Sequence, residues 1–140
     1  MTVPAHLTLE IVTPDRPILK EQVDEVEVPG ADGYFGVLPG HTPLLASLKV
    51  GELWYRKGGE KFFLSIAFGF AEVLPDRVTI LARIAERAED IDVERAEAER
   101  QRAEAELARP ASTVDFDRVR ISLMKALVRL QVATRARTRG

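Results

Sequence analysis

The chain has 140 residues, 46% of them hydrophobic and 30% charged, and a formal net charge of -2, which suits one ordinary domain or two small ones with a packed core. The near-neutral charge gives no global basic field for nucleic acid, and the absence of cysteine excludes disulfides, thiolate metal sites and cysteine nucleophiles. No apolar run approaches the roughly 20 residues that span a bilayer, and the N-terminus is unlike a signal or transit peptide, so we expect a soluble protein of a reducing compartment.

Residues 1–86 predict an all-β domain, either a β-sandwich or a flattened barrel. Residues 6–12 alternate apolar and polar side chains, as a half-buried strand does. Lys57–Gly58–Gly59–Glu60 separates two strand-like runs and therefore predicts a hairpin. Further strands are expected around Val23–Val28 and at 62–66, 70–74 and 78–82. Short strands separated by regular turns are typical of sandwiches and flattened barrels.

Some of these strands are apolar on both faces, notably at Phe62–Leu64 and Val78–Ala82. A sandwich buries only one face of each sheet internally. One explanation for a second apolar face is local over-packing or a loop that covers it. The other is that this face docks a partner. Composition alone leaves both explanations open.

Residues 87–140 predict an antiparallel hairpin of two helices, because the sequence beyond Ala85 is rich in Ala, Glu and Arg. Asp90 or Asp92 is expected to cap the first helix, and Pro110 stops it. The apolar stripe of this helix is narrow and contains Val93, Ala96, Ala103 and Leu107.

The second helix has a much larger apolar face. Thr113 or Asp115 is expected to cap it. The face consists of Phe116, Val119, Leu123, Leu127 and Leu130, broadened by Ile121, Met124 and Val128. The first helix cannot cover such a face, and a pair of helices this small buries little apolar surface. We therefore expect the hairpin to open easily unless it is docked or liganded.

Four cations on the two helices could converge. Arg95 and Arg102 share a face of the first helix, and Lys125 and Arg129 share a face of the second. Cations that converge repel one another unless an anion binds between them, and a polyphosphate is a suitable anion. The alternative is that each cation pairs with a neighbouring Glu or points into water.

Nothing in the sequence resembles a catalytic constellation. The phosphate-cradling P-loop pattern is absent, and the serines lack a nucleophile-elbow context. The two histidines, His6 and His41, are far apart in sequence, and His41 lies in a Pro-rich and Gly-containing turn. An enzyme is therefore a distant possibility.

Four segments carry a resemblance to a known family. They are Gly33–Leu44 (GYFGVLPGHTPL), Ala67–Val73 (AFGFAEV), Val78–Ala82 (VTILA) and Ala85–Asp92 (AERAEDID). In combination they strongly resemble the epsilon subunit of bacterial F-type ATP synthases, and the resemblance runs from about His6 to about Val132.

The resemblance implies a noncatalytic central-stalk (rotor) subunit of a proton- or sodium-translocating ATP synthase, with no required cofactor. In the family, the β-sandwich binds the gamma subunit and sits on the ring of c subunits. The helical hairpin switches between a compact form and an extended form, which reaches the alpha and beta subunits and inhibits ATP hydrolysis. The expected location is peripheral, on the cytoplasmic face of the bacterial inner membrane, with membrane contact only through the complex.

The resemblance also implies ATP as a regulatory ligand. Ile91–Ala96 matches the I/L-D-x-x-R-A motif of members that bind ATP in the compact form. The implied contacts are Glu86, Ile91, Asp92, Arg95, Ala96, Arg102, Lys125 and Arg129. Lys125 stands where the pattern usually has Arg, and it lacks the planar fork for bidentate phosphate contact. Without a ligand, Asp92 is explained as an N-cap and Ala96 as a close helix contact.

Two further sets of residues are implied by the resemblance. Tyr34 and His41 lie in the loop that faces the c ring, where His41 matches the family but many relatives have an acidic residue in place of Tyr34. Arg118, Arg120 and Arg135 belong to the basic second helix, which is expected to be the inhibitory arm. A free-standing ATP-sensing binding module is the alternative of a different class.

Overall fold

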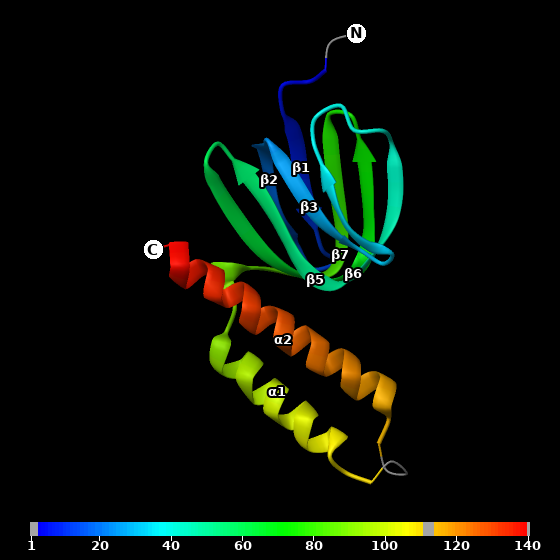
Figure 1. Ribbon diagram of the computed structural model, residues 1–140, viewed down its shortest axis with the longest axis vertical. Helices are drawn as coiled ribbons and strands as arrows, with labels where there is room; N and C mark the ends of the chain where they lie inside the picture. Colours follow the sequence, from blue (N-terminus) through cyan, green and yellow to red (C-terminus); the bar gives the residue numbers. More distant parts are fainter. Residues whose placement is uncertain (1–2, 111–113, 140) are drawn as a thin grey trace. The chain divides into compact units, whose positions relative to one another are not determined.

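The computed structural model describes residues 3–110 and 114–139 of the chain, with side chains up to residue 136 at the C-terminal end. The chain divides after Arg87 into two compact units. A β-domain is followed by a helical hairpin, which confirms the predicted fold class (Figure 1). None of the helices in the described part of the chain is long and apolar enough to cross a membrane.

Within the described residues, the first unit is one sheet of seven strands in the order β2-β1-β7-β6-β5-β3-β4. The strands are β1 (Leu7–Val12), β2 (Pro17–Val23), β3 (Glu25–Gly30), β4 (Gly33–Val37), β5 (Leu44–Lys57), β6 (Glu60–Leu74) and β7 (Arg77–Arg87). Neighbouring strands pair antiparallel, except that β1 pairs parallel with β7. Every strand contributes buried side chains to a single core, so the sheet wraps around that core.

The core reflects the alternation that predicted β1. Leu7, Leu9 and Ile11 are fully buried, whereas the residues between them are half-buried. The predicted hairpin is confirmed, because Lys57 pairs with Glu60 across a two-residue turn in which Gly58 has φ 60°. Such a turn needs a positive φ, which glycine adopts without a steric penalty.

The long strand β6 changes the face that it presents to the core halfway along its length. Leu64 and Ile66 belong to the core before the change, and Ala71 and Val73 belong to it afterwards. Between them, Phe68 and Gly69 have positive φ angles of 63° and 123°. A Cβ atom on Gly69 would collide with the carbonyl oxygen of Leu81 on β7. The local backbone therefore reverses the alternation, and the lack of a side chain at Gly69 permits it.

The second unit contains the 3-10 turn η1 (Ala88–Asp90) and the helices α1 (Val93–Leu107) and α2 (Phe116–Arg139). Asp92 is the N-cap of α1, since its Oδ1 accepts the backbone N–H of Arg95 at 3.1 Å. Asp90 instead ends η1. Asp115 acts in the same way for α2, accepting the N–H of Arg118 at 3.2 Å, while Thr113 lies outside the described residues.

The two helices lie side by side in opposite directions (Figure 1). Ala96 and Ala103 of α1 are buried, and so are Val119, Ala126 and Ala133 of α2, which repeat every seven residues. Phe116 and Leu127, expected on the apolar face, are 45% and 46% exposed, and Met124 is also exposed. The most deeply buried positions are therefore mainly small residues, which let two helix backbones approach closely, while part of the larger apolar face remains uncovered.

Candidate anion-binding site in the helical hairpin

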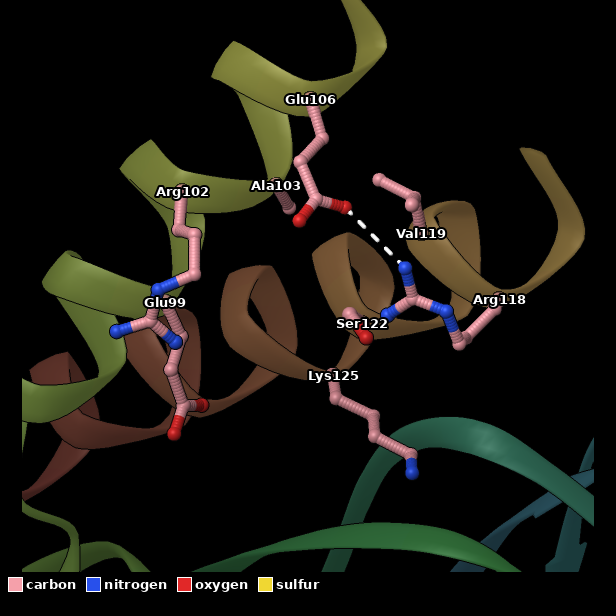
Figure 2. Close-up of a pocket in the computed structure, with 8 residues that line it drawn as sticks. All are labelled: Glu99, Arg102, Ala103, Glu106, Arg118, Val119, Ser122 and Lys125. Carbon is pink, nitrogen blue, oxygen red and sulfur yellow. Dashed lines mark hydrogen bonds and ion pairs between the residues drawn. The ribbon is translucent and has the colours of Figure 1, made fainter. Parts of the chain in front are cut away.

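A pocket of about 320 Å³ lies between α1 and α2. Figure 2 shows its lining, which is Glu99, Arg102, Ala103 and Glu106 from α1 and Arg118, Val119, Ser122 and Lys125 from α2. Ala103 and Val119 are buried apolar residues. The polar lining comprises three cations, two carboxylates and a hydroxyl, which is a composition suited to an anion once one carboxylate is displaced or neutralised.

Glu99 connects this pocket to two more cations. Its Oε1 lies 3.2 Å from Nε of Arg95, and its Oε2 lies 3.1 Å from Nη1 of Arg129. Of the other two predicted cations, Arg102 and Lys125 line the same pocket as Glu99, although the Lys125 side chain points away from it in Figure 2. Pairing with a neighbouring Glu, the alternative explanation for these cations, holds for Arg95 and Arg129 in this state.

The residues of the Ile91–Ala96 motif, Arg95 included, build the start of α1 and do not line the pocket. Ile91 is buried, and its N–H donates to the carbonyl oxygen of Ala88 at 3.4 Å. Asp92 caps the helix, and Ala96 is fully buried with its N–H bonded to the Asp92 carbonyl at 3.0 Å. Glu86 belongs to β7 in the first unit, where it pairs in register with Ser65.

The three arginines of the expected inhibitory arm all lie on α2 and have different surroundings. Arg118 donates to Oε2 of Glu106 at 3.4 Å across the hairpin, as Figure 2 shows. Arg120 donates to Oδ1 of Asp117 at 3.3 Å within α2, and both side chains are largely exposed. Arg135 is half-buried near the end of α2. Only Arg118 therefore shares the pocket with the predicted nucleotide contacts.

Tyr34 lies in β4, at the edge of the sheet beside β3. His41 lies between β4 and β5, directly after Gly40, whose N–H donates to the carbonyl oxygen of Pro75 in the turn between β6 and β7. The Tyr34 hydroxyl accepts the N–H of Glu52 at 3.2 Å, and the ammonium of Lys49 lies 4.4 Å from the ring centroid. His41 follows β4, with Nδ1 2.6 Å from the carbonyl oxygen of Thr42. Tyr34 also lines a groove of about 610 Å³ formed by residues 30–35 and 44–47.

An exposed apolar patch lies on the outer face of the sheet; sequence reasoning weighed a docking surface there but did not single out its residues. Leu45, Phe70 and Leu81 are 72%, 54% and 52% exposed. Phe70 pairs in register with Leu81, and Leu45 pairs with Glu72, which places Leu45 diagonal to Phe70. We call these three residues the outer-face patch. The run of apolar residues at 78–82 was a signal for Leu81, but only the reversal at Phe68–Gly69 puts Phe70 on this face.

Comparison with known proteins identifies the family. A family model described as the beta-sandwich domain of the ATP synthase delta/epsilon chain matches residues 6–88, and one described as its long alpha-helix domain matches residues 89–134. The ATP synthase epsilon chain of Syntrophobacter fumaroxidans is 53% identical over 127 residues, covering 91% of this chain and 95% of that one. The epsilon chain of Geobacter metallireducens is 50% identical, covering 91% and 93%.

Solved structures agree with the sequence comparisons. A chain in the Euglena gracilis mitochondrial ATP synthase structure (OSCP, F1 and c-ring) has a TM-score of 0.72 and 26% identity, covering 99% of this chain and 84% of that one. A chain in the Tetrahymena thermophila central stalk and c-ring structure has a TM-score of 0.57 and 12% identity, covering 96% and 98%, which shows the shared fold. With both units matched over nearly their whole length, the chain belongs to the delta/epsilon chain family of the ATP synthase.

Proposed function

We propose that this chain acts as the noncatalytic rotor subunit of a proton- or sodium-translocating F-type ATP synthase. It couples rotation to catalysis and inhibits ATP hydrolysis through its helical hairpin. The observation that carries the proposal is that both units match their counterparts in the family, with the two matches meeting at residues 88 and 89. The likeness to a chain of a solved ATP synthase that includes F1 and the c-ring supports the rotor role.

The β-domain is proposed to dock the gamma subunit and the c ring. The outer-face patch (Leu45, Phe70, Leu81) supports this, since contiguous exposed apolar side chains mark interaction surfaces. Tyr34 and His41, in the segment 33–44, are proposed to contact the c ring. The chain would then be peripheral on the cytoplasmic face of the bacterial inner membrane and reach the membrane only through the complex.

The hairpin is proposed to be a two-state element. Its most deeply buried side chains are small and part of α2's apolar face is exposed, so closing it contributes little burial. ATP held by the closed hairpin would bias it toward the compact, uninhibited form, since a ligand shifts an equilibrium through its differential affinity for the two states. Arg102 and Lys125 in the pocket, together with Arg95 and Arg129, support the nucleotide site.

The open hairpin is proposed to inhibit by placing α2 against acidic surface of the alpha and beta subunits. Arg120 supports this role, because its side chain is 69% exposed and that of Asp117, with which it pairs, is 88% exposed. Pairs so exposed contribute little to stability and are easily exchanged for another partner.

The test is ATP hydrolysis by the complex reconstituted with this chain. We expect Arg118→Glu, Arg120→Glu and Arg135→Glu combined to relieve inhibition while the chain still copurifies with gamma. Unchanged hydrolysis would refute the inhibitory arm. A chain that binds ATP in calorimetry and never associates with gamma would refute the rotor role and favour a free-standing ATP-sensing module.

A further inference from the structure

Glu99 occupies the place where the cations of the hairpin meet. Its two carboxylate oxygens accept from different guanidiniums, Arg95 on α1 at 3.2 Å and Arg129 on α2 at 3.1 Å. The same side chain lines the pocket that contains Arg102 and Lys125. One glutamate therefore bonds to two of the four cations that sequence reasoning assigned to an anionic ligand, and it lines the same pocket as the other two.

The pair that Glu99 makes with Arg129 differs from other ion pairs of α1, including the second cross-helix pair, Glu106 with Arg118, in which the Arg118 side chain is 63% exposed. Glu97 and Glu104 both pair with Arg100, within their own helix. Glu99 reaches across to the other helix, and the Arg129 side chain is only 13% exposed. A charged hydrogen bond shielded in this way is screened less by water and salt than an exposed one. The pair thus links α1 to α2 in the absence of any ligand.

The geometry also places Glu99 in competition with an anion. Two carboxylate oxygens, each bonded to a separate guanidinium, use the donors that phosphate oxygens would use. A phosphate group that takes these donors must displace the carboxylate and then meets it as a neighbouring like charge. Both effects lower the affinity for an anion.

We propose that Glu99 is an internal counter-ion, which closes the hairpin without a ligand and competes with polyphosphate for Arg95 and Arg129. The proposal rests on the nucleotide-binding part of the proposed function, and it adds the residue that tunes it. A hairpin with this glutamate depends less on nucleotide for its closure and binds nucleotide more weakly than one with a neutral residue at this position.

The test is calorimetric titration of the full chain with inorganic tripolyphosphate and with ATP. Glu99→Gln keeps the shape of the side chain and removes its charge. Glu104→Gln is the matched control, since it removes the same charge from the same helix but leaves the Glu99 contacts in place. We expect Glu99→Gln to bind tripolyphosphate about tenfold more tightly than the parent, which corresponds to about 1.4 kcal/mol, and Glu104→Gln to stay within about twofold of the parent, as an exposed charge does.

Two further variants separate competition from a general change in the helix. Adding Arg95→Gln to Glu99→Gln is expected to abolish the gain, because it removes one of the released donors. Glu99→Asp keeps the charge, so it is expected to gain far less affinity than Glu99→Gln. Helicity by circular dichroism checks that each variant retains the hairpin.

The closing function of Glu99 is measured without ligand by hydrogen exchange. We expect faster exchange of α2 amides around Arg129 in Glu99→Gln than in Glu104→Gln. Equal exchange in the two variants, or equal tripolyphosphate affinity in Glu99→Gln and the parent, would overturn the proposal. If the parent and Glu99→Gln bind ATP with the same affinity, the counter-ion proposal is overturned and the nucleotide site stands. If neither protein binds ATP, the nucleotide site is removed as well, and the rotor role is unaffected.

Discussion

Replacing Gly69 with alanine is expected to destabilise the β-domain strongly. Gly69 has φ 123°, and an added Cβ would collide with the backbone carbonyl oxygen of Leu81 on the neighbouring strand. Backbone strain of this kind costs about 1–2 kcal/mol, and pushing apart two packed strands costs about 1–3 kcal/mol more. The expected loss is therefore about 3 kcal/mol, which in a domain of this size lowers Tm by roughly 12 °C or more.

Guanidinium unfolding followed by tryptophan fluorescence measures this loss. Trp54 is the one tryptophan of the chain and lies in β5, so its signal reports on the β-domain. Gly36→Ala is the matched control, because Gly36 lies in β4 with no atom near the added Cβ. We expect the control to stay within about 0.5 kcal/mol of the parent. A Gly69→Ala protein as stable as the control would refute the argument that this glycine permits β6 to change faces.

Three other predictions concern packing, capping and pH. Ala126→Leu places a larger side chain at a fully buried position of the helix pair, so we expect faster hydrogen exchange throughout α2 than in Gln131→Leu, an exposed position of the same helix. Asp92→Ala removes the N-cap of α1 and is expected to cost about 1 kcal/mol of hairpin stability. The loss is measured as faster amide exchange in the first turn of α1, and unchanged exchange there would contradict the cap. The Gly58 N–H, donated to Asp24 at 2.7 Å, together with His6, holds the pKa of the Asp24 carboxyl below its ordinary value of 3.8. A carboxyl with a depressed folded pKa contributes stability above its unfolded pKa and loses it as pH falls through the folded pKa, so carbon-13 titration of Asp24 is expected to show a midpoint below 3.8, and the Asp24→Asn protein to lack this acid-dependent loss.

Local signals in the sequence predicted several elements correctly because the interactions that form them are local. The alternation of residues 6–12 specifies a half-buried strand wherever its partners lie. The Gly-Gly turn at 58–59 joins strands that are adjacent in sequence. Asp92 bonds to a backbone N–H three residues away. Each of these contacts spans only a few residues, so its residue types are sufficient to indicate it.

The candidate site was only partly accessible to sequence reasoning. Spacing along each helix placed Arg95 and Arg102 on one face and Lys125 and Arg129 on another. It did not indicate Glu99, because α1 contains several glutamates at similar spacing. Only the position of α2 shows that Glu99 reaches Arg129 and that Glu106 reaches Arg118. The N-cap had two candidates, Asp90 and Asp92, and the turn η1 selected Asp92 by ending at Asp90.

Sequence reasoning joined Val23 of β2 to the strand β3, did not indicate β4, and divided β6 into two strands. By itself, the sequence determined that a β-domain precedes two helices, the turn at Gly58–Gly59, and the motifs that place the chain in its family. These depend on side-chain period and on backbone conformations that single residues favour. Tertiary structure alone decided the parallel pairing of β1 with β7, the exposure of the outer-face patch, and the burial of Ala126 while Leu127 stays exposed. It also decided the pairing of Glu99 with Arg129, thirty residues apart. The physical reason is that these outcomes depend on which distant surfaces meet, and several residues of similar chemistry compete for each place until packing selects among them.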